Sequence, residues 1–473
     1  MSNNNKIIPK NLLPNSYAAR DVASQIHPYT NLEAHLKNGP LVIKSGDGVR
    51  VFDEDGKGYI EGMSGLWCTS LGWSEKRLVK AAIASMERLA FYHNFTGKAP
   101  EVTIDLAERL IKLAPEPLNR SGSKVFFANS GSEAVDTAIK FIWYINNTRG
   151  KPEKKKIISR IKAYHGVTVA AASLTGLPVC QNDFDLPISG IIHTDCPHHY
   201  RFANDGETEE DFASRLADNL EKLILKEGPE TIAAMFMEPV MGAGGVIVPP
   251  KTYFEKIQAV LNKYDILIVA DEVICGFGRT GNMWGSQTYG IRPDMITMAK
   301  ALSSAYAPIS ALVVSEDVFA GLVAGSARNG PLGHGYTYSG HPLGAAVAME
   351  TLNIYEERDI VAEVKAKTPR FQDGLKSFAS HPLVGEVRGV GLVGAIEVVK
   401  NKNTKEAFDP KHGVGTHLVA QAQTEGVILR AMGDTVAFSP PLIISEQEIA
   451  EMFASFARAL EETENWVSDQ GLR

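Results

Sequence analysis

The feature that most constrains the fold is a series of short apolar runs separated by amphipathic segments, between residues 125 and 315. The runs are VFFAN, KKIISRI, AAMFMEP, DILIVAD, DMITMAK and ISALVVS, at 125–129, 155–161, 233–239, 265–271, 294–300 and 309–315. Segments 212–228 and 253–265, which lie between such runs, have helical periodicity. Apolar strands that alternate with helices predict an α/β fold with a mostly parallel sheet covered on both faces.

The alternation stops near residue 345, and the chain is too long for one compact unit. Its 473 residues, 44% of them hydrophobic, are enough for two subdomains. Segment 343–359 predicts a long helix, and 390–399 predicts one of several shorter strands. We therefore expect a large domain over 71–345, a small α+β domain over 346–473, and an N-terminal segment over 1–70 that joins the small domain.

Composition excludes several classes of protein. The net charge is -7, without a basic run interleaved with aromatic residues, so nucleic acid is not an expected partner. No apolar run approaches the length of a membrane span, and the start, MSNNNKIIPKNLL, lacks the core of a signal peptide. The scattered cysteines predict neither disulfides nor a zinc knuckle, and we expect a cytoplasmic location. They are Cys68, Cys180, Cys196 and Cys275.

The segment HTDCPHHY, at 193–200, has spacing that resembles a metal site. Its proline and the polar loop that follows are typical of a solvated turn, and no second pair of ligands is evident. We therefore predict no metal.

Two carboxylates, Asp271 and Glu272, stand together at the end of the run DILIVAD. Ligands of open α/β sheets bind beyond the carboxyl ends of the strands. Because side chains alternate along a strand, one acid can face a ligand while the other pairs elsewhere. An ionised acid there needs a partner, which is either a protonated ring nitrogen of a ligand or a structural contact with Arg279 or a backbone cap.

Lys300 ends the next apolar run. A buried ammonium is unfavourable, so desolvation would lower the pKa of this amine and make it a nucleophile, as a Schiff-base lysine requires. The alternative is a lysine whose amine reaches solvent at the edge of the sheet.

Other polar residues follow the remaining runs. Ser130 and Glu133 have the spacing of a capping box, and Ser130, Gly131 and Ser132 would form an anion site at a helix start. The alternative is an ordinary capped helix. Tyr164 and His165 could cover a flat ligand or only pack. One ligand with a phosphate, a basic ring nitrogen and an aldehyde would use all these groups, and that ligand is pyridoxal 5'-phosphate (PLP).

The same motifs resemble the class III aminotransferases, and especially the amine:pyruvate (omega) transaminases. They are NSGSEA at 129–134, AYHG at 163–166, EPVMGAGG at 238–245, DEVICGFGRTG at 271–281, AKALSSAY at 299–306 and HGYTYSGHP at 334–342. The likeness extends from about His27 to the C-terminus. It implies the type I PLP fold, with a large domain and a small domain built from both chain ends.

The resemblance implies a role for each matching residue. Lys300 would be the Schiff-base lysine, Asp271 would contact the pyridine nitrogen, and Thr337 would reach the cofactor of a neighbouring subunit in a homodimer. The other cofactor contacts would be Ser130, Gly131, Ser132, Tyr164, His165, Glu238 and Val273. The substrate pocket would be lined by Leu66, Trp67, Phe91, Tyr92, Phe95, Tyr164 and Arg430. Arg430 would bind a carboxylate, although a surface ion pair is the alternative, and the aromatic cluster 91–95 could instead be core.

Some positions depart from the family pattern. Many class III enzymes have Gln where Ile274 stands, and Gly where Ala301 and Ala305 stand. The two methyl groups would tighten the site or stabilise the loop by restricting the unfolded chain.

The expected reaction moves an amino group from a primary amine or omega-amino acid to pyruvate, in two half-reactions through pyridoxamine phosphate. The alternatives are an aminomutase or decarboxylase on the same fold, and a catalytically silent PLP-binding protein. The presence of both Lys300 and Asp271 argues against the silent protein.

Overall fold

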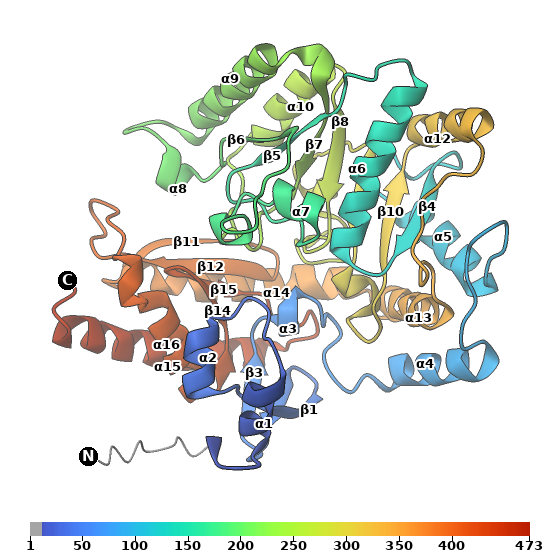
Figure 1. Ribbon diagram of the computed structural model, residues 1–473. Coiled ribbons are helices and arrows are strands. Elements are labelled where there is room, and N and C mark those ends of the chain that lie inside the picture. The colour runs from blue at the N-terminus through green and yellow to red at the C-terminus, as the bar shows by residue number, and fades with distance from the viewer. Residues whose placement is uncertain (1–11) are drawn as a thin grey trace, which may run out of the picture.

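A seven-stranded sheet forms the core of the upper half of the molecule in Figure 1. The computed structural model describes residues 12–473. The strand order is β4-β10-β9-β8-β7-β5-β6, and all neighbours from β9 to β6 are parallel. Only β10 runs antiparallel to its neighbours, β4 and β9. The strands are β4 (Lys124–Ala128), β5 (Lys156–Arg160), β6 (Ile191–Thr194), β7 (Ile232–Met237), β8 (Leu267–Asp271), β9 (Met295–Met298) and β10 (Ser310–Val314).

Helices cover both faces of this sheet, because successive strand residues are apolar and point to opposite sides. On β7, Phe236 packs with α6 (Gly131–Thr148), α7 (Val169–Leu174) and α12 (Glu316–Asn329). Its neighbour Met235 belongs to the other core, together with α5 (Glu101–Leu113), α9 (Glu209–Glu227), α10 (Tyr253–Lys263) and α13 (Pro342–Arg358). The predicted mostly parallel, doubly covered sheet is therefore confirmed.

Two four-stranded sheets form the rest of the molecule. One has the order β1-β2-β3-β13, in which a strand from the C-terminal part pairs with β3. The other is antiparallel, with the order β11-β12-β15-β14. The first sheet unites both ends of the chain, as the fold class predicts. The strands are β1 (Ile43–Asp47), β2 (Arg50–Asp53), β3 (Gly58–Glu61), β11 (Val384–Val390), β12 (Val393–Val398), β13 (Val427–Ile428), β14 (Arg430–Met432) and β15 (Thr435–Phe438).

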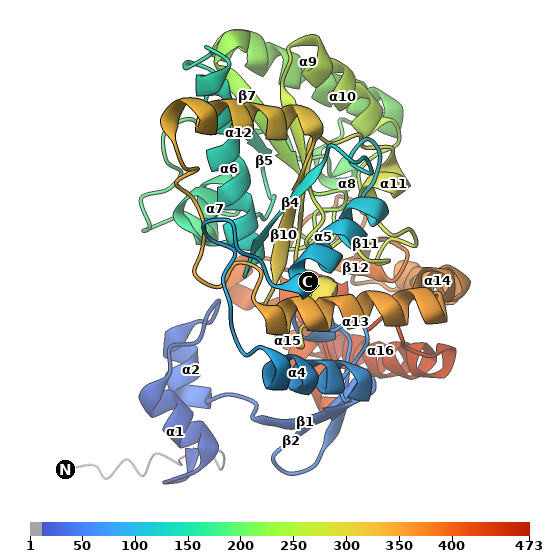
Figure 2. The same ribbon diagram turned by 90° about the vertical axis from the view of Figure 1, so that its right-hand side faces the viewer.

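The remaining helices pack around these sheets or at the edges of the molecule (Figure 2). The predicted helix over 343–359 corresponds to α13. No helix in residues 12–473 has the length and apolar character needed to cross a membrane. The other α-helices are α1 (Tyr17–Ser24), α2 (Leu32–Asn38), α3 (Ser64–Trp67), α4 (Lys76–Arg88), α8 (His199–Phe202), α11 (Gly285–Tyr289), α14 (Ile360–Lys376), α15 (Val414–Thr424) and α16 (Glu446–Asp469).

Candidate active site

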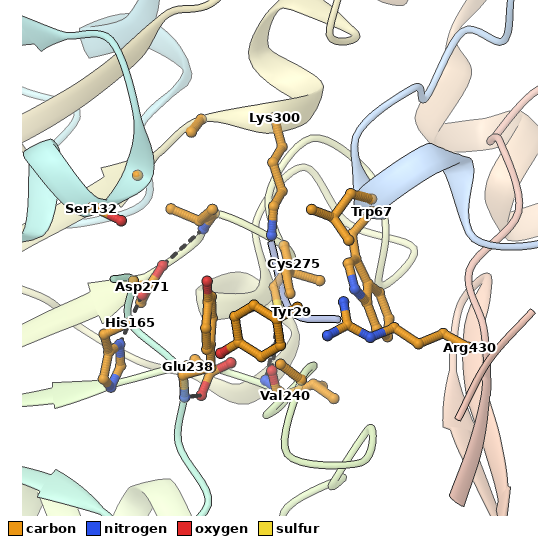
Figure 3. A pocket seen from close by; sticks show the side chains of 18 of the residues that line it. Tyr29, Trp67, Ser132, His165, Glu238, Val240, Asp271, Cys275, Lys300 and Arg430 are labelled. Carbon is orange, nitrogen blue, oxygen red and sulfur yellow. Dashed lines mark hydrogen bonds and ion pairs between the residues drawn. The ribbon is translucent and has the colours of Figure 1, made fainter. Parts of the chain in front are cut away.

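The carboxyl ends of the parallel strands open into a cavity of about 700 Å³. Asp271 ends β8, Glu238 follows β7, His165 follows β5 and Lys300 follows β9. Figure 3 shows Ser132, Asp271 and His165 on one side of this cavity and Trp67 and Arg430 on the opposite side. The sheet thus brings together side chains that are far apart in the sequence.

The two adjacent carboxylates point in different directions, as the strand geometry predicts. Asp271 is 4% exposed, and its carboxylate lies 2.8 Å from His165 Nδ1 and accepts a 3.1 Å hydrogen bond from the Val273 amide. Glu272 accepts hydrogen bonds from the amides of Gly285 and Ser286, at 2.9 and 2.6 Å. Burial raises the pKa of Glu272 to about 7. Only Asp271 is therefore available to the cavity.

Arg279 is not the partner of Asp271. Its guanidinium donates to the carbonyl oxygens of Leu392 and Pro440, at 3.0 and 2.6 Å. In the described part of the chain, Asp271 has no lysine or arginine within 4.0 Å. A buried carboxylate with one imidazole and one amide as partners can still accept a proton-bearing ring nitrogen.

Lys300 begins a 3-10 turn (Lys300–Ser303) just after β9, and its side chain reaches into the cavity (Figure 3). Its φ of 49° lies in the left-handed region, which is unusual for a residue with a side chain. Among residues 12–473 it forms no ion pair within 4.0 Å. Desolvation is the main cause that lowers the pKa of its amine, and the charge of Arg430 acts in the same direction. The amine therefore has more of its neutral, nucleophilic form than an exposed lysine has.

The start of α6 faces the same cavity. Ser130 is the N-cap, and its hydroxyl accepts a 3.2 Å hydrogen bond from the Glu133 amide. The Glu133 carboxylate binds the Asn129 amide instead of the Ser130 amide, so the predicted capping box forms only in part. The first amides of a helix lack partners within it, so Gly131 and Ser132 offer N–H groups and the positive end of the helix dipole to an anion.

Glu238 organises the floor of the cavity. Its two carboxylate oxygens accept hydrogen bonds from the amides of Tyr164, at 3.0 Å, and Gly242, at 3.1 Å. Burial raises the pKa of Glu238. Tyr164 itself lines the cavity, so its ring is available to cover a flat ligand. One buried nitrogen here, His165 Nε2, has no hydrogen-bond partner in the described chain.

Trp67 and Arg430 lie on the opposite side of the cavity (Figure 3), and Leu66 and Tyr29 also line it. Trp67 is 2% exposed, whereas the other three are more open. The Arg430 guanidinium lies 5.6 Å from the centre of the Tyr29 ring, a cation–π contact. It has no carboxylate within 4.0 Å among residues 12–473, so the alternative of a surface ion pair does not hold.

Three of the predicted pocket residues are elsewhere. Phe91, Tyr92 and Phe95 are 40–41% exposed, so the alternative of a core cluster is wrong. They do not line the cavity of this chain, and their role in the substrate pocket stays a prediction. They follow α4 and lie beside the 334–342 loop, where Phe91 packs edge-on against Tyr338 at 5.8 Å. Thr337, in that loop, is also exposed.

The segment HTDCPHHY is not the expected solvated turn, because Cys196 and His198 are 3% and 2% exposed. Its histidines bind separate partners: His193 the Leu174 carbonyl oxygen, His198 the Glu386 carboxylate and His199 the Glu207 carbonyl oxygen. They do not converge on one point.

Sequence reasoning missed several residues that line the cavity. Val240 and Ala243 belong to the glycine-rich loop after β7, where the strand-end rule could have found them. Pro28 and Tyr29 come from the N-terminal segment, and no local motif marks them. Cys275 lines the cavity beside Ile274.

The methyl groups at 301 and 305 have different environments. Ala301 is buried and has no positive φ, whereas Ala305 is exposed with a φ of 64°. A side chain at positive φ is strained, so the expected stabilisation cannot apply to Ala305.

Known proteins share this sequence and fold. Residues 32–460 match the family model for class III aminotransferases. A gamma-aminobutyrate transaminase 3 of Solanum lycopersicum, named as chloroplastic, is 50% identical over 462 residues, covering 97% of this chain and 88% of that protein. A mitochondrial gamma-aminobutyrate transaminase 1 of Oryza sativa subsp. japonica is 53% identical over 430 residues, covering 91% and 83%.

Among solved structures, the omega transaminase from Pseudomonas jessenii in complex with PMP has a TM-score of 0.94 and 55% identity. The match covers 96% of this chain and 99% of that one. A thermostable omega transaminase variant engineered for the synthesis of bulky amines has a TM-score of 0.93 at the same identity, covering 96% and 100%.

The names of the plant relatives contradict the cytoplasmic location that the sequence predicted. That prediction was based on scattered cysteines and on the absence of a signal peptide. Free thiols do not distinguish one compartment that keeps cysteines reduced from another, so they could not support this choice.

The residues of the cavity fit PLP. A buried carboxylate, with no lysine or arginine of residues 12–473 within 4.0 Å, lies across from an amine of lowered pKa. The amides at the start of α6 suit a phosphate, and Tyr164 can cover a ring. The match to the family model spans most of the chain, and the relatives and the solved structures agree with it. The chain therefore belongs to the class III aminotransferases and is a PLP-dependent enzyme.

Proposed function

We propose that this enzyme transfers an amino group from a primary amine or an omega-amino acid to pyruvate or a similar keto acid. The observation that carries the proposal is Arg430, which lines the same cavity as Lys300 and has no carboxylate within 4.0 Å of its guanidinium in the described part of the chain. A guanidinium suits the carboxylate of a keto acid or of an omega-amino acid. Gamma-aminobutyrate is such an omega-amino acid, and it appears in the names of the plant relatives. The apolar wall formed by Trp67 and Leu66 suits the hydrocarbon part of an amine.

We assign the cofactor contacts as follows. The start of α6 would bind the phosphate, Tyr164 and Val273 would cover the two faces of the ring, and Asp271 would hold a proton on the ring nitrogen. His165 would orient Asp271 through its 2.8 Å contact, and Glu238 would fix the Tyr164 backbone. The complete set is Ser130, Gly131, Ser132, Tyr164, His165, Glu238, Asp271, Val273 and Lys300.

When bound, PLP supplies a ring that accepts electrons from the substrate carbon. Lys300 would then act as the general base and acid that takes the proton from this carbon and returns it. Its lowered pKa helps, because only the neutral amine can accept a proton. Arg430 would orient acids by their carboxylates, and Trp67 would exclude water from the reacting side.

We also propose a homodimer, the state typical of the family. Four exposed residues would then contribute to the site of a second copy: Phe91, Tyr92, Phe95 and Thr337. The first three belong to a segment that packs beside the loop of Thr337, through the contact of Phe91 with Tyr338. The division into 1–70, 71–345 and 346–473 remains our proposal for the domains.

The test is product analysis with the purified, PLP-loaded enzyme. Gamma-aminobutyrate or an apolar primary amine is supplied together with pyruvate, and alanine is measured. We expect alanine in proportion to the donor consumed, and none with Lys300→Ala. Donor consumption without alanine would contradict the proposal and would favour an aminomutase or a decarboxylase.

A further inference from the structure

Three metal-ligand side chains, Asp21, His27 and His35, converge in the N-terminal segment, outside the machinery proposed above. The Nε2 atoms of His27 and His35 lie 2.8 and 3.1 Å from the same carboxylate oxygen of Asp21. The two imidazole rings lie 4.2 Å apart, centroid to centroid, with a tilt of 33°. All three ligand atoms are within 4.8 Å of one another. Two imidazole nitrogens and one carboxylate oxygen thus surround one point.

The cluster joins two helices that share little apolar core. Asp21 belongs to α1, His35 to α2 and His27 to the loop between them. The only buried residues of these helices are Ala18 and His35. Figure 2 shows α1 and α2 together at one edge of the molecule, away from the large sheet. A small unit of this kind needs stabilisation other than apolar burial, and a bound metal can supply it.

The competing cations distinguish this cluster from two others in the described chain. Arg388 and Arg201 pair with the glutamates beside His198, and Arg473 pairs with Glu464 beside His381. In each of those clusters an arginine already pairs with at least one of the carboxylates. Asp21 has no lysine or arginine within 4.0 Å in residues 12–473, so imidazoles are its only ion-pair partners there.

We propose that Asp21, His27 and His35 bind a divalent transition-metal ion, with Zn²⁺ as the best match to this ligand set and water as the fourth ligand. Zinc–ligand bonds of about 2.0–2.1 Å in a tetrahedron place the ligand atoms about 3.3 Å apart. The observed separations of 2.8 and 3.1 Å need to open by only a few tenths of an ångström. Water has access from the side of His27, whose side chain is 29% exposed.

Coordination also fixes the protons. Each Nε2 must offer a lone pair, so both rings carry their hydrogen on Nδ1, and a protonated imidazole must first release a proton.

The site would act on the cavity through the loop between the helices. This loop carries Pro28 and Tyr29, which line the cavity, and the Tyr29 ring lies beneath Arg430. A metal that holds both ends of the loop would restrict Tyr29 and thereby the position of the Arg430 guanidinium.

The test uses the full-length holoenzyme after treatment with a chelator and its removal. Titration with ZnCl₂ in a calorimeter, and with CoCl₂ in an absorption spectrometer, gives the stoichiometry and the dissociation constant. We expect one site per chain and tetrahedral Co²⁺ bands. Asp21→Asn and His27→Gln should each raise the dissociation constant at least about tenfold. Even residues that only hydrogen-bond to a metal ligand change the metal affinity by about 10–100-fold. Glu461→Gln, in the cluster beside His381, is the matched control and should bind as the unmodified enzyme does.

Limited proteolysis within residues 25–31 provides a readout that does not depend on activity. Zn²⁺ should slow cleavage there in the unmodified chain and in Glu461→Gln, but not in Asp21→Asn. His27→Gln changes a partly exposed side chain, so it keeps the test valid if Asp21→Asn does not fold. The proposal is overturned if no ion binds, or if binding is unchanged in both variants.

Discussion

The two sides of the active-site cavity are constructed differently. On the side of Asp271 and Glu238, the carboxylates accept hydrogen bonds from neighbouring backbone amides and lie next to parallel strands. On the side of Arg430, the guanidinium contacts the Tyr29 ring, and no carboxylate of residues 12–473 lies within 4.0 Å of it. The first side is fixed by the sheet before any ligand binds, whereas the second side keeps an unpaired charge for a ligand.

This difference separates chemistry from selectivity. Groups held by the sheet are suited to a cofactor that must stay in one orientation through every turnover. A guanidinium on a short strand, beside a loop from the N-terminal segment, can adjust to substrates with and without a carboxylate. Changes on the Asp271 side should therefore lower kcat for all donors, and changes on the Arg430 side should alter KM for some of them.

Lys300→Ala should have the largest effect. It removes the general base and the nucleophilic amine together, so kcat should fall by more than about 10³-fold for every donor. Steady-state rates of alanine formation measure this, with the exposed Lys376→Ala as a control. Undiminished turnover in Lys300→Ala would refute its role.

Asp271→Asn should lower kcat by about 10²–10⁴-fold, because a neutral amide cannot hold a proton on the ring nitrogen. The neighbouring Glu272→Gln is the matched control. Its side chain faces Gly285 and Ser286, so it should change stability and leave the rate of the folded enzyme nearly unchanged. Equal losses of kcat in the two variants would contradict the claim that only Asp271 takes part in the reaction.

Arg430→Ala should raise KM for pyruvate and gamma-aminobutyrate by about 10–100-fold, which is the loss of affinity expected when a hydrogen bond between charged groups is removed. The KM of an apolar amine should stay within about threefold. Tyr29→Leu should produce a smaller rise in the same KM values, about two- to fivefold, since the cation–π contact with Arg430 that it removes is weaker than a hydrogen-bonded charge pair. If KM for the apolar amine rose equally, Arg430 would not discriminate between substrates by their carboxylates.

The smallest expected effect is a change in stability caused by substitutions next to Lys300. Ala305→Gly should raise the free energy of unfolding by about 0.5–1 kcal/mol, because φ is 64° there. Ala301→Gly should lower it by about 0.4–1 kcal/mol through the entropy of the unfolded chain. Denaturant melts give the free energy of unfolding of both variants. A change in the same direction in both would contradict the argument from backbone conformation.

The same division explains what could be predicted from the sequence. Asp271, Glu238 and Lys300 follow apolar strands, so a local pattern and one rule of α/β sheets place them at a common edge. The antiparallel β10 could not be predicted, because strand direction depends on how the chain returns to the sheet and not on local apolarity.

The substrate side was less predictable for a physical reason. Tyr29, Trp67 and Arg430 come from three distant segments, and only tertiary packing brings them to the cavity. The resemblance to a family marked Trp67 and Arg430, but nothing local marked Tyr29. The prediction for Phe91, Tyr92 and Phe95 depended on neighbours that a single chain does not supply.

The most direct test of the central claim is to identify the residue that bonds to the cofactor. The PLP-loaded enzyme is reduced with borohydride and digested, and the modified peptide is sequenced by mass spectrometry. We predict a single pyridoxyl group on Lys300, and loss of that label in Lys300→Ala. A label on any other lysine, with Lys300 unmodified, would contradict the account.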